Sequence, residues 1–228
     1  MALDLAILYE DNHLIAVNKP AGVLSQGDKT GDIVLADIVK EYLVKKYNKP
    51  GEAFLGVIHR LDRPVSGVVL LAKTSKALAR MNELFKTRAV QKTYWAIVEQ
   101  KPAIEKATLV HWLKKNEAKN MSFASKTESK DALKCELEYE YKDSSDKYHL
   151  LEVNPHTGRH HQIRVQLSTI GCKIKGDLKY GAKRSNPDAS ISLHARKLTF
   201  VHPVSKEPVE IIAPVPEEVV WKFFENRQ

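Results

Sequence analysis

An aspartate with arginines on both sides is the first feature of the sequence that could do chemistry. Asp62 lies in the segment His-Arg-Leu-Asp-Arg-Pro-Val-Ser-Gly, residues 59–67, between apolar runs at residues 54–58 and 68–72. The runs predict two strands, and the proline and glycine predict an irregular loop. Neighbouring cations favour an ionised carboxylate. On local sequence alone, a turn cap or a surface pair with an arginine is the better interpretation, so a chemical role for Asp62 depends on the rest of the chain.

A second segment, residues 156–164, gathers histidines and arginines after a predicted strand. Its Thr-Gly-Arg sequence predicts a turn. From His161 onward, apolar residues fit both a strand and a helix, and Gly171 as a stop signal favours a short helix. On that helix His160 and Arg164 would share a face.

The histidines of this segment, His156, His160 and His161, raise the question of a metal site. Adjacent ligands on one element point in different directions, and no carboxylate follows three or four residues later. Neighbouring arginines would also repel a dication. We therefore predict that no metal is bound here.

Two other kinds of site are absent from the sequence. No G-x-G-x-x-G pattern is present, and Ser66 does not lie in the G-x-S-x-G pattern of a nucleophilic serine. The reactive groups that remain are Asp62, a hydroxyl such as that of Tyr94, and guanidinium groups. This set suits a carboxylate that acts as nucleophile or base beside an arginine.

Four motifs follow one another along the chain: His59-Arg60-Leu61-Asp62 with Ser66-Gly67, Lys92-x-Tyr94, Thr157-Gly158-Arg159-x-His161-Gln162-Ile163-Arg164, and Gly176-Asp177-x-x-Tyr180-Gly181. With these motifs in this order, the chain resembles the RluA-type branch of the RNA pseudouridine synthases. The resemblance runs from Lys19-Pro20-x-Gly22 to Leu193-His194-Ala195 and His202-Pro203, which is most of the chain.

The resemblance implies an isomerase that converts uridine in ribosomal or transfer RNA to pseudouridine, without a metal or an organic cofactor. It implies an α+β fold with a mixed, mainly antiparallel sheet, flanking helices and a central catalytic cleft. The corresponding domain would be single and span residues 1–228, with no separate N-terminal RNA-binding module.

The resemblance also implies roles for individual residues. Asp62 resembles the essential carboxylate, which attacks the ribose or the base. Tyr94 resembles the tyrosine that packs on the base and helps to deprotonate the product, and Arg164 resembles the arginine that pairs with the catalytic aspartate. Ile163 resembles the apolar residue beneath the base. Further residues expected to bind the substrate are His59, Arg60, Arg63, Arg159 and His161.

The chain departs from the family pattern at Val65, Gln166 and Lys173-Ile174. None of these positions carries a proposed catalytic group, so the departures bear on the choice of RNA. Weaker candidates for phosphate contacts are Lys173, Lys175, Lys179, Lys183 and Arg184, for which ordinary surface charge is the competing interpretation.

Periodicity and turn signals predict the elements that would position these groups. Strands are expected at residues 7–9, 14–18, 54–58, 68–72, 92–99, 109–113, 135–141, 148–153, 198–201 and 209–213. Helices are expected at residues 32–47, from the N-cap Thr74 to about Arg88, and at residues 216–226, the last with Val220, Phe223 and Phe224 as its apolar face. Residues 114–130, rich in lysine, predict a long exposed loop or a hairpin tip, and their lysines are either solvated surface charge or contacts to RNA phosphates.

Composition agrees with a globular protein that binds RNA. Hydrophobic residues make up 43% of the 228 residues, and the net charge is +8 with a pI near 9.3. The two cysteines form no C-x-x-C pair, and the N-terminus lacks the features of a signal peptide. We expect a cytoplasmic monomer that does not bind membranes.

Two alternatives remain open from the sequence. A non-catalytic RNA-binding or ribosome-assembly protein could use the same scaffold, although the presence of Asp62, Tyr94 and Arg164 favours an enzyme. A metal-dependent nuclease that uses the histidine cluster would be inhibited by a chelator.

Overall fold

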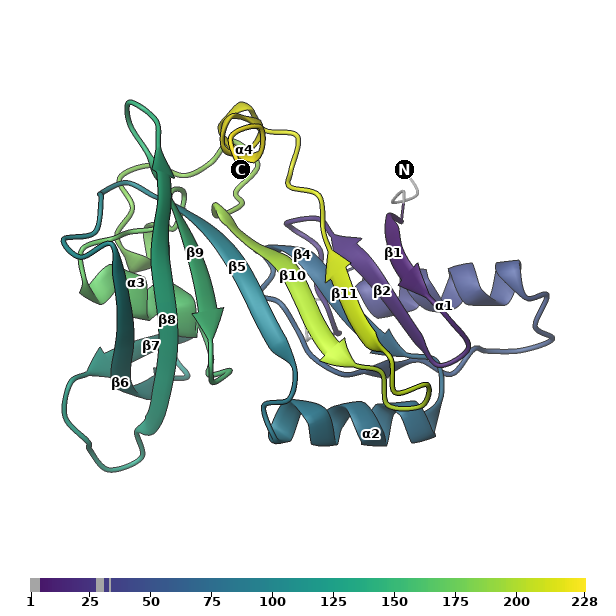
Figure 1. The fold of residues 1–228 in the computed structure, drawn as a ribbon. Coiled ribbons are helices and arrows are strands. Elements are labelled where there is room, and N and C mark those ends of the chain that lie inside the picture. Colours follow the sequence, from purple (N-terminus) through teal and green to yellow (C-terminus); the bar gives the residue numbers. More distant parts are fainter. Residues whose placement is uncertain (1–4, 28–30, 33) are drawn as a thin grey trace. The chain divides into compact units, whose positions relative to one another are not determined.

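A computed structural model describes residues 5–27, 31–32 and 34–228. Its chain divides into two compact units (Figure 1). The first unit comprises the chain up to Gln91 together with Ala195–Pro216, and the second comprises Lys92–His194 and Glu217–Gln228. The proposed site residues are distributed over both units: Asp62 belongs to the first, and Tyr94 and Arg164 belong to the second.

The first unit contains a sheet in the order β1-β2-β4-β10, with β11 paired to β10 and β3 paired to β4. The strands are β1 (Ile7–Glu10), β2 (Leu14–Lys19), β3 (Gly56–Val57), β4 (Ser66–Ala72), β10 (Leu193–Val201, from Ala195 onward in this unit) and β11 (Pro208–Ile212). The pairs β1–β2, β2–β4, β3–β4 and β10–β11 are antiparallel. Every residue of β4 is buried, which explains why its sequence is a continuous apolar run. The predicted strand at residues 54–58 is reduced to the two residues of β3.

Two helices belong to the first unit. α2 (Ser75–Lys86) begins as predicted, because the Thr74 hydroxyl accepts a hydrogen bond from the Ala77 amide at 3.2 Å. α1 (Leu35–Lys46) begins three residues later than the predicted start at Asp32. The N-cap of that helix is Val34, and the Asp32 carboxylate accepts a hydrogen bond from Arg63 Nη1 at 2.8 Å.

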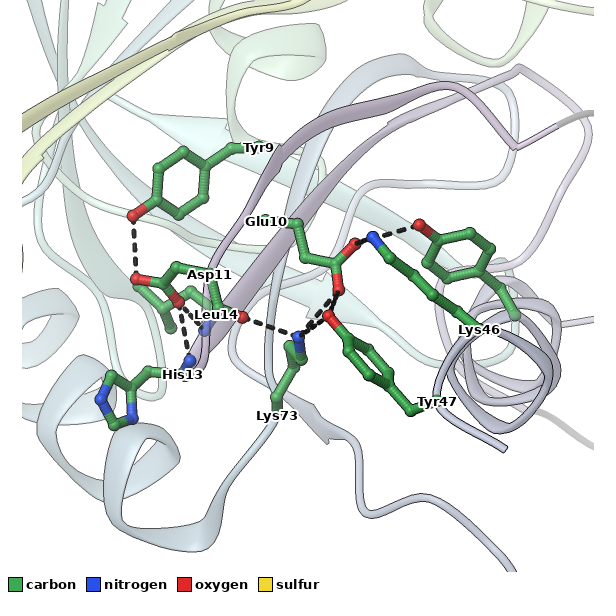
Figure 2. A network of polar contacts seen from close by, with 9 residues as sticks. Tyr9, Glu10, Asp11, His13, Leu14, Lys46, Tyr47 and Lys73 are labelled. Carbon is green, nitrogen blue, oxygen red and sulfur yellow. Dashed lines mark hydrogen bonds and ion pairs between the residues drawn. The ribbon is translucent and has the colours of Figure 1, made fainter. Parts of the chain in front are cut away.

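A polar network joins β1 to α1 and to the residue that follows β4. The Glu10 carboxylate lies between Lys46, Tyr47 and Lys73 (Figure 2). It accepts hydrogen bonds from these three side chains at 2.7, 2.6 and 2.8 Å. The Tyr42 hydroxyl donates a further bond at 3.0 Å. Burial raises the pKa of Glu10, but these hydrogen bonds outweigh burial and lower it to about 2.

The second unit contains a sheet in the order β5-β9-β8-β6-β7, in which all neighbours are antiparallel. The strands are β5 (Gln91–Val98, from Lys92 onward in this unit), β6 (Lys106–Asn116), β7 (Met121–Ser125), β8 (Leu133–Ser144) and β9 (His149–Pro155). α3 (Gln162–Thr169) packs against β6, β7 and the short 3₁₀ helix η1 (Leu178–Tyr180), and α4 (Val219–Glu225) ends the chain. The strands predicted at residues 135–141 and 148–153 are confirmed, and the antiparallel β8–β9 pairing joins them in a hairpin.

For residues 114–130 the hairpin-tip prediction is confirmed, because the turn of the antiparallel β6–β7 pair lies between Asn116 and Met121. The alternative of a long exposed loop is wrong, because Met121–Ser125 pair with β6 and Ser122 is buried. The apolar face predicted for the last helix is wrong in part. In α4 the buried residues are Trp221 and Phe224, whereas Phe223 is exposed. The predicted apolar face omitted Trp221, whose ring lies 5.7 Å from that of His194.

Both cysteines lie inside the second unit. Cys135 and Cys172 are free thiols with 0% and 1% exposure, and burial raises the pKa of each to about 11. In the part of the chain that the structure describes, no helix combines the length and apolar character that crossing a bilayer requires.

Candidate active site

Asp62 lies on a loop between β3 and β4 that is anchored on both sides of the carboxylate. Leu61 and Val65 are buried, with 7% and 2% exposure, whereas Asp62 is only half-buried. The Ser25 hydroxyl donates to the Leu61 carbonyl at 3.0 Å and accepts from the Leu61 amide at 3.1 Å. The Val65 amide donates to the Asp62 carbonyl at 3.0 Å. The loop is thereby fixed while its carboxylate stays accessible.

The end of this loop requires glycine at position 67. Gly67 has a φ of +118°, which side chains of L residues rarely adopt. A β-carbon there would also overlap with the backbone of Ala195 on β10. The Ser-Gly of the first motif is therefore a packing requirement where β4 begins.

A buried lysine connects the loop to the segment after β2. Lys19 has 0% exposure, and its ammonium group donates to the carbonyls of Pro20, Val23 and Arg63 at 3.1, 2.8 and 3.3 Å. Burial lowers the pKa of Lys19 to about 7; the nearby Asp62 carboxylate raises it and the Arg63 guanidinium lowers it, each by less. Lys19 lies in the Lys-Pro-x-Gly motif at which the family resemblance begins, and the sequence alone predicted no role for it.

Three predicted substrate-binding residues lie on the same loop in different settings. Arg63 donates to the Gly22 carbonyl at 3.0 Å as well as to Asp32, so its guanidinium holds loop segments together. His59 accepts a hydrogen bond from the Leu70 amide at 3.0 Å, and its ring stacks on Phe85 at 5.1 Å. Arg60 is exposed. Of the three, Arg60 is the side chain best suited to reach a phosphate.

In the second unit, Arg164 is held by a buried carboxylate. Arg164 Nε donates to one Asp177 oxygen at 2.7 Å and Nη2 donates to the other at 2.9 Å. The two side chains are 5% and 2% exposed, and the guanidinium lies 5.1 Å from the Tyr180 ring. A bidentate pair of this kind fixes the orientation of the arginine. Asp177 belongs to the fourth sequence motif, but the sequence alone did not identify it as the partner of Arg164.

The turn before α3 is organised by Gln162. Its side-chain oxygen accepts bonds from the Thr157 hydroxyl at 2.7 Å and the Arg159 amide at 3.0 Å, and its amide nitrogen donates to the Glu136 carbonyl at 3.0 Å. His161 is the N-cap and has a left-handed backbone with a φ of 54°. Because His160 precedes the helix, the prediction that His160 and Arg164 share a helical face is wrong.

The histidine nitrogens of this segment are used in hydrogen bonds. His160 Nδ1 lies 2.9 Å from the Ser122 hydroxyl, and His161 Nδ1 lies 2.9 Å from the Tyr180 hydroxyl. The two imidazole rings stack at 3.8 Å. Among the described residues, no group of three His, Cys, Asp or Glu side chains is arranged to hold a metal ion.

The remaining predicted residues of the second unit lie near the start of α3 or on β5. Tyr94 is half-buried on β5 and pairs with Val153 of β9. Ile163 is buried at 7%, and Arg159 is exposed with its Nε 3.4 Å from the Lys134 carbonyl. The start of α3 therefore carries three of the predicted groups: the oriented guanidinium of Arg164, the apolar side chain of Ile163 and, just before the helix, the exposed Arg159.

Comparison with known families gives a consistent result. A family model described as RNA pseudouridylate synthase matches residues 13–169, which include Asp62, Tyr94 and Arg164. Ribosomal large subunit pseudouridine synthase D of Xanthomonas campestris is 30% identical over 95% of this chain and 68% of the relative. Ribosomal large subunit pseudouridine synthase C of Rickettsia prowazekii is 33% identical over 92% and 68%.

Solved structures agree with the fold prediction. The structure described as human RNA pseudouridylate synthase domain containing 4 has a TM-score of 0.79 and 25% identity, covering 97% of this chain and 93% of that one. Human RNA pseudouridylate synthase domain containing 1 has a TM-score of 0.73 at 23% identity, covering 97% and 87%. These matches and the strand pairings confirm the α+β fold with a mainly antiparallel sheet; the central catalytic cleft stays a prediction.

Proposed function

Because the chain belongs to the RNA pseudouridine synthase family, we propose that it isomerises specific uridines in ribosomal RNA to pseudouridine, with Asp62 as the essential carboxylate. The choice of ribosomal RNA rests on the names of the relatives, and transfer RNA is the alternative substrate. The observation that carries the proposal is the half-buried Asp62 on a loop whose neighbours Leu61 and Val65 are buried.

The reaction needs a nucleophile, a rotation of the base and a proton transfer. The N1–C1′ bond of uridine breaks, a C5–C1′ bond forms, the C5 proton is lost and N1 gains a proton, so that the composition is unchanged. A carboxylate can break a glycosidic bond by stabilising a developing sugar cation or by forming an adduct. Asp62 acts in this way on the ribose or on the base. The uridine must first leave its stack, at a cost of a few kcal/mol.

Two further residues have proposed roles in the reaction. Tyr94 packs on the uracil ring and helps to remove the C5 proton. Arg164 pairs with Asp62 and keeps it ionised and oriented, since a guanidinium favours the charged form of a carboxylate. The two hydrogen bonds that Arg164 donates to Asp177 support this role, because they fix the orientation of the guanidinium.

The direct test is tritium release from RNA labelled at uracil C5. Wild-type protein should release tritium from ribosomal RNA transcripts in the presence of excess EDTA. Asp62→Asn removes the charge and the nucleophile with little change in volume, so release should fall by at least about 10³-fold, roughly 4 kcal/mol in transition-state energy. Binding of the same RNA should survive.

Asp131→Asn is a matched control for this substitution. Asp131 is 67% exposed and has a left-handed φ of 66°, which asparagine also tolerates. The control should retain wild-type turnover. Near-normal turnover by Asp62→Asn would disprove the role of Asp62, and no release from any cellular RNA by folded wild-type protein would disprove the activity.

Location and assembly are accompanying proposals. Two buried free cysteines fit a reducing compartment, which supports a cytoplasmic protein. Size-exclusion chromatography of the free protein tests the proposal of a monomer, which predicts a mass near 25.8 kDa.

A further inference from the structure

The second unit contains a cavity of about 490 Å³ with an excess of positive charge in its lining. Four cationic residues and one carboxylate line it. We call it the basic cavity, and its lining residues are Glu99, Gln100, Lys147, Tyr148, Lys175, Lys183, Arg184, Ser185, Asn186 and Pro187. Its volume is in the range of small-molecule sites, so it can admit one nucleotide.

Three of the four cations are available to a ligand. Lys175 is engaged, because its ammonium group donates to Asn186 Oδ1 and pairs with Glu218, both at 2.6 Å. Lys147, Lys183 and Arg184 are exposed and form no ion pair within the residues that the structure describes. They come from the β8–β9 turn and from the loop after η1. An anion in the cavity would therefore be contacted from two sides.

The wall of the basic cavity is preformed. Asn186 is buried, and its side-chain nitrogen donates to the hydroxyls of Ser190 and Ser192 at 3.2 and 3.3 Å. Gly176 has a φ of +88°, and a β-carbon there would lie 2.8 Å from the Asn186 side chain. The close approach of these segments fixes the loop that carries Lys183 and Arg184.

An aromatic ring and an unpaired acceptor add chemical selectivity. The Tyr148 ring lies on the cavity wall, 5.8 Å from the Lys175 ammonium group, and offers a surface for a base. Glu99 Oε1 accepts from the Lys183 amide at 3.1 Å, whereas Oε2 is buried without a donor in the described structure. A ligand hydroxyl or amino group can supply that donor after a small movement of the side chain. A ligand that offers a phosphate to the cations, a base to the Tyr148 ring and a hydroxyl to Glu99 is a ribonucleotide.

The position of the basic cavity relates it to Tyr94. Glu99 directly follows β5 and lies five residues after Tyr94, which corresponds to roughly 16 Å along an extended strand. The Glu99 amide donates to the Lys173 carbonyl at 2.9 Å, and the Lys175 amide donates to the Ile97 carbonyl at 2.9 Å. Backbone hydrogen bonds thus join the cavity wall to the strand that presents Tyr94.

We propose that the basic cavity binds a ribonucleotide of the substrate RNA a few positions away from the target uridine. Its phosphate contacts Lys147, Lys183 and Arg184, its base packs on Tyr148, and its 2′-hydroxyl donates to Glu99. The identification of the ligand as substrate RNA rests on the proposed function. Under this proposal, Lys147, Lys183 and Arg184 bind RNA and are more than ordinary surface charge.

The test measures binding of a fluorescent twelve-residue oligouridylate, which does not depend on turnover. Lys183→Gln/Arg184→Gln should weaken binding about tenfold or more. It should also reduce the slope of log K against log salt concentration by the amount expected for the loss of about one to two phosphate contacts. Lys147→Gln, on the other segment, should weaken binding in the same direction. The matched control is Lys106→Gln/Lys142→Gln, which removes two charges of β6 and β8 that already have carboxylate partners; it should stay within about twofold of wild type.

Two further measurements identify the ligand class. Wild type should prefer the oligouridylate to the matching oligodeoxyuridylate, and Glu99→Gln should reduce that preference, because RNA differs from DNA at the 2′-hydroxyl. Thermal unfolding of each variant checks that it is folded. Wild-type binding by both Lys183→Gln/Arg184→Gln and Lys147→Gln would overturn the proposal. Equal competition by inorganic phosphate or by polyglutamate would overturn the assignment to a ribonucleotide.

Failure of this proposal is distinguishable from failure of the proposed function. If the basic cavity has no role, the cavity variants bind RNA normally while wild type still releases tritium. If the protein is not a synthase, wild type releases no tritium whether or not the oligouridylate binds.

Discussion

Arg164 is 5% exposed, and both oxygens of Asp177 accept hydrogen bonds from its guanidinium. A substitution of Arg164 therefore removes a proposed partner of Asp62 and also leaves a buried carboxylate without its cation. Loss of activity in such a variant would not by itself demonstrate the proposed pair with Asp62. Stability and activity have to be measured together at this position.

We expect Arg164→Met to lower the free energy of unfolding by about 3–5 kcal/mol, because it leaves Asp177 buried and unpaired. The double variant Arg164→Met/Asp177→Asn should recover part of this loss, since the uncompensated charge is gone. Urea unfolding of the wild type, both single variants and the double variant forms a complete double-mutant cycle. Strictly additive losses would contradict the interpretation of Arg164–Asp177 as one coupled unit.

At the scale of elements, β4 depends on Gly67 at its start. Gly67→Ala introduces a β-carbon at a positive φ and against the Ala195 backbone, so it should destabilise the protein by roughly 2–5 kcal/mol. Gly51→Ala is the control, because a β-carbon there meets nothing within 4 Å. Denaturant midpoints of the two variants give the comparison, and equal midpoints would show that β4 tolerates the added carbon.

The Glu10 network predicts how the stability of the contact between β1 and α1 depends on pH. The folded pKa of about 2 lies below the ordinary glutamate pKa of 4.5, so the network contributes its stability above about pH 4.5 and loses it as the pH falls towards 2. Glu10→Gln should cost on the order of 2–3 kcal/mol at pH 7, and the difference from wild type should shrink between pH 4.5 and 2.5. Urea unfolding at several pH values measures this difference.

Glu83→Gln provides the comparison for an exposed carboxylate. Glu83 is 62% exposed on α2 and lies 3.9 Å from Lys86, so its removal should change stability by less than about 1 kcal/mol at any pH. A Glu10 variant that behaved like this control would mean that the network in Figure 2 adds no stability.

For the whole molecule, the sequence predicted best where one local rule was sufficient. Thr74 caps α2, the apolar run of β4 is buried, and Gly171 with a φ of +83° ends the α3 segment. These features depend on hydrogen bonds, burial and backbone freedom within a few residues. The motifs placed Asp62 on a loop and Arg164 on a short helix, as the structure has them.

Prediction failed where distant residues determine the local structure. In β7 the buried residue is Ser122 and the exposed one is Phe123, the reverse of an ordinary strand pattern, because Ser122 is bonded to Tyr180 and His160. The role of Asp177 depends on its contact with Arg164, thirteen residues earlier in the chain. Neither hydrophobic periodicity nor turn chemistry contains that information.

The buried thiols have a practical consequence for labelling. With pKa values of about 11, Cys135 and Cys172 present almost no thiolate near neutral pH, and the fold shields both from reagents. A cysteine introduced at an exposed position would therefore be the preferred target of a maleimide dye. One such dye on each unit would turn the native chain into a fluorescence ruler that reports how the units respond when RNA is added.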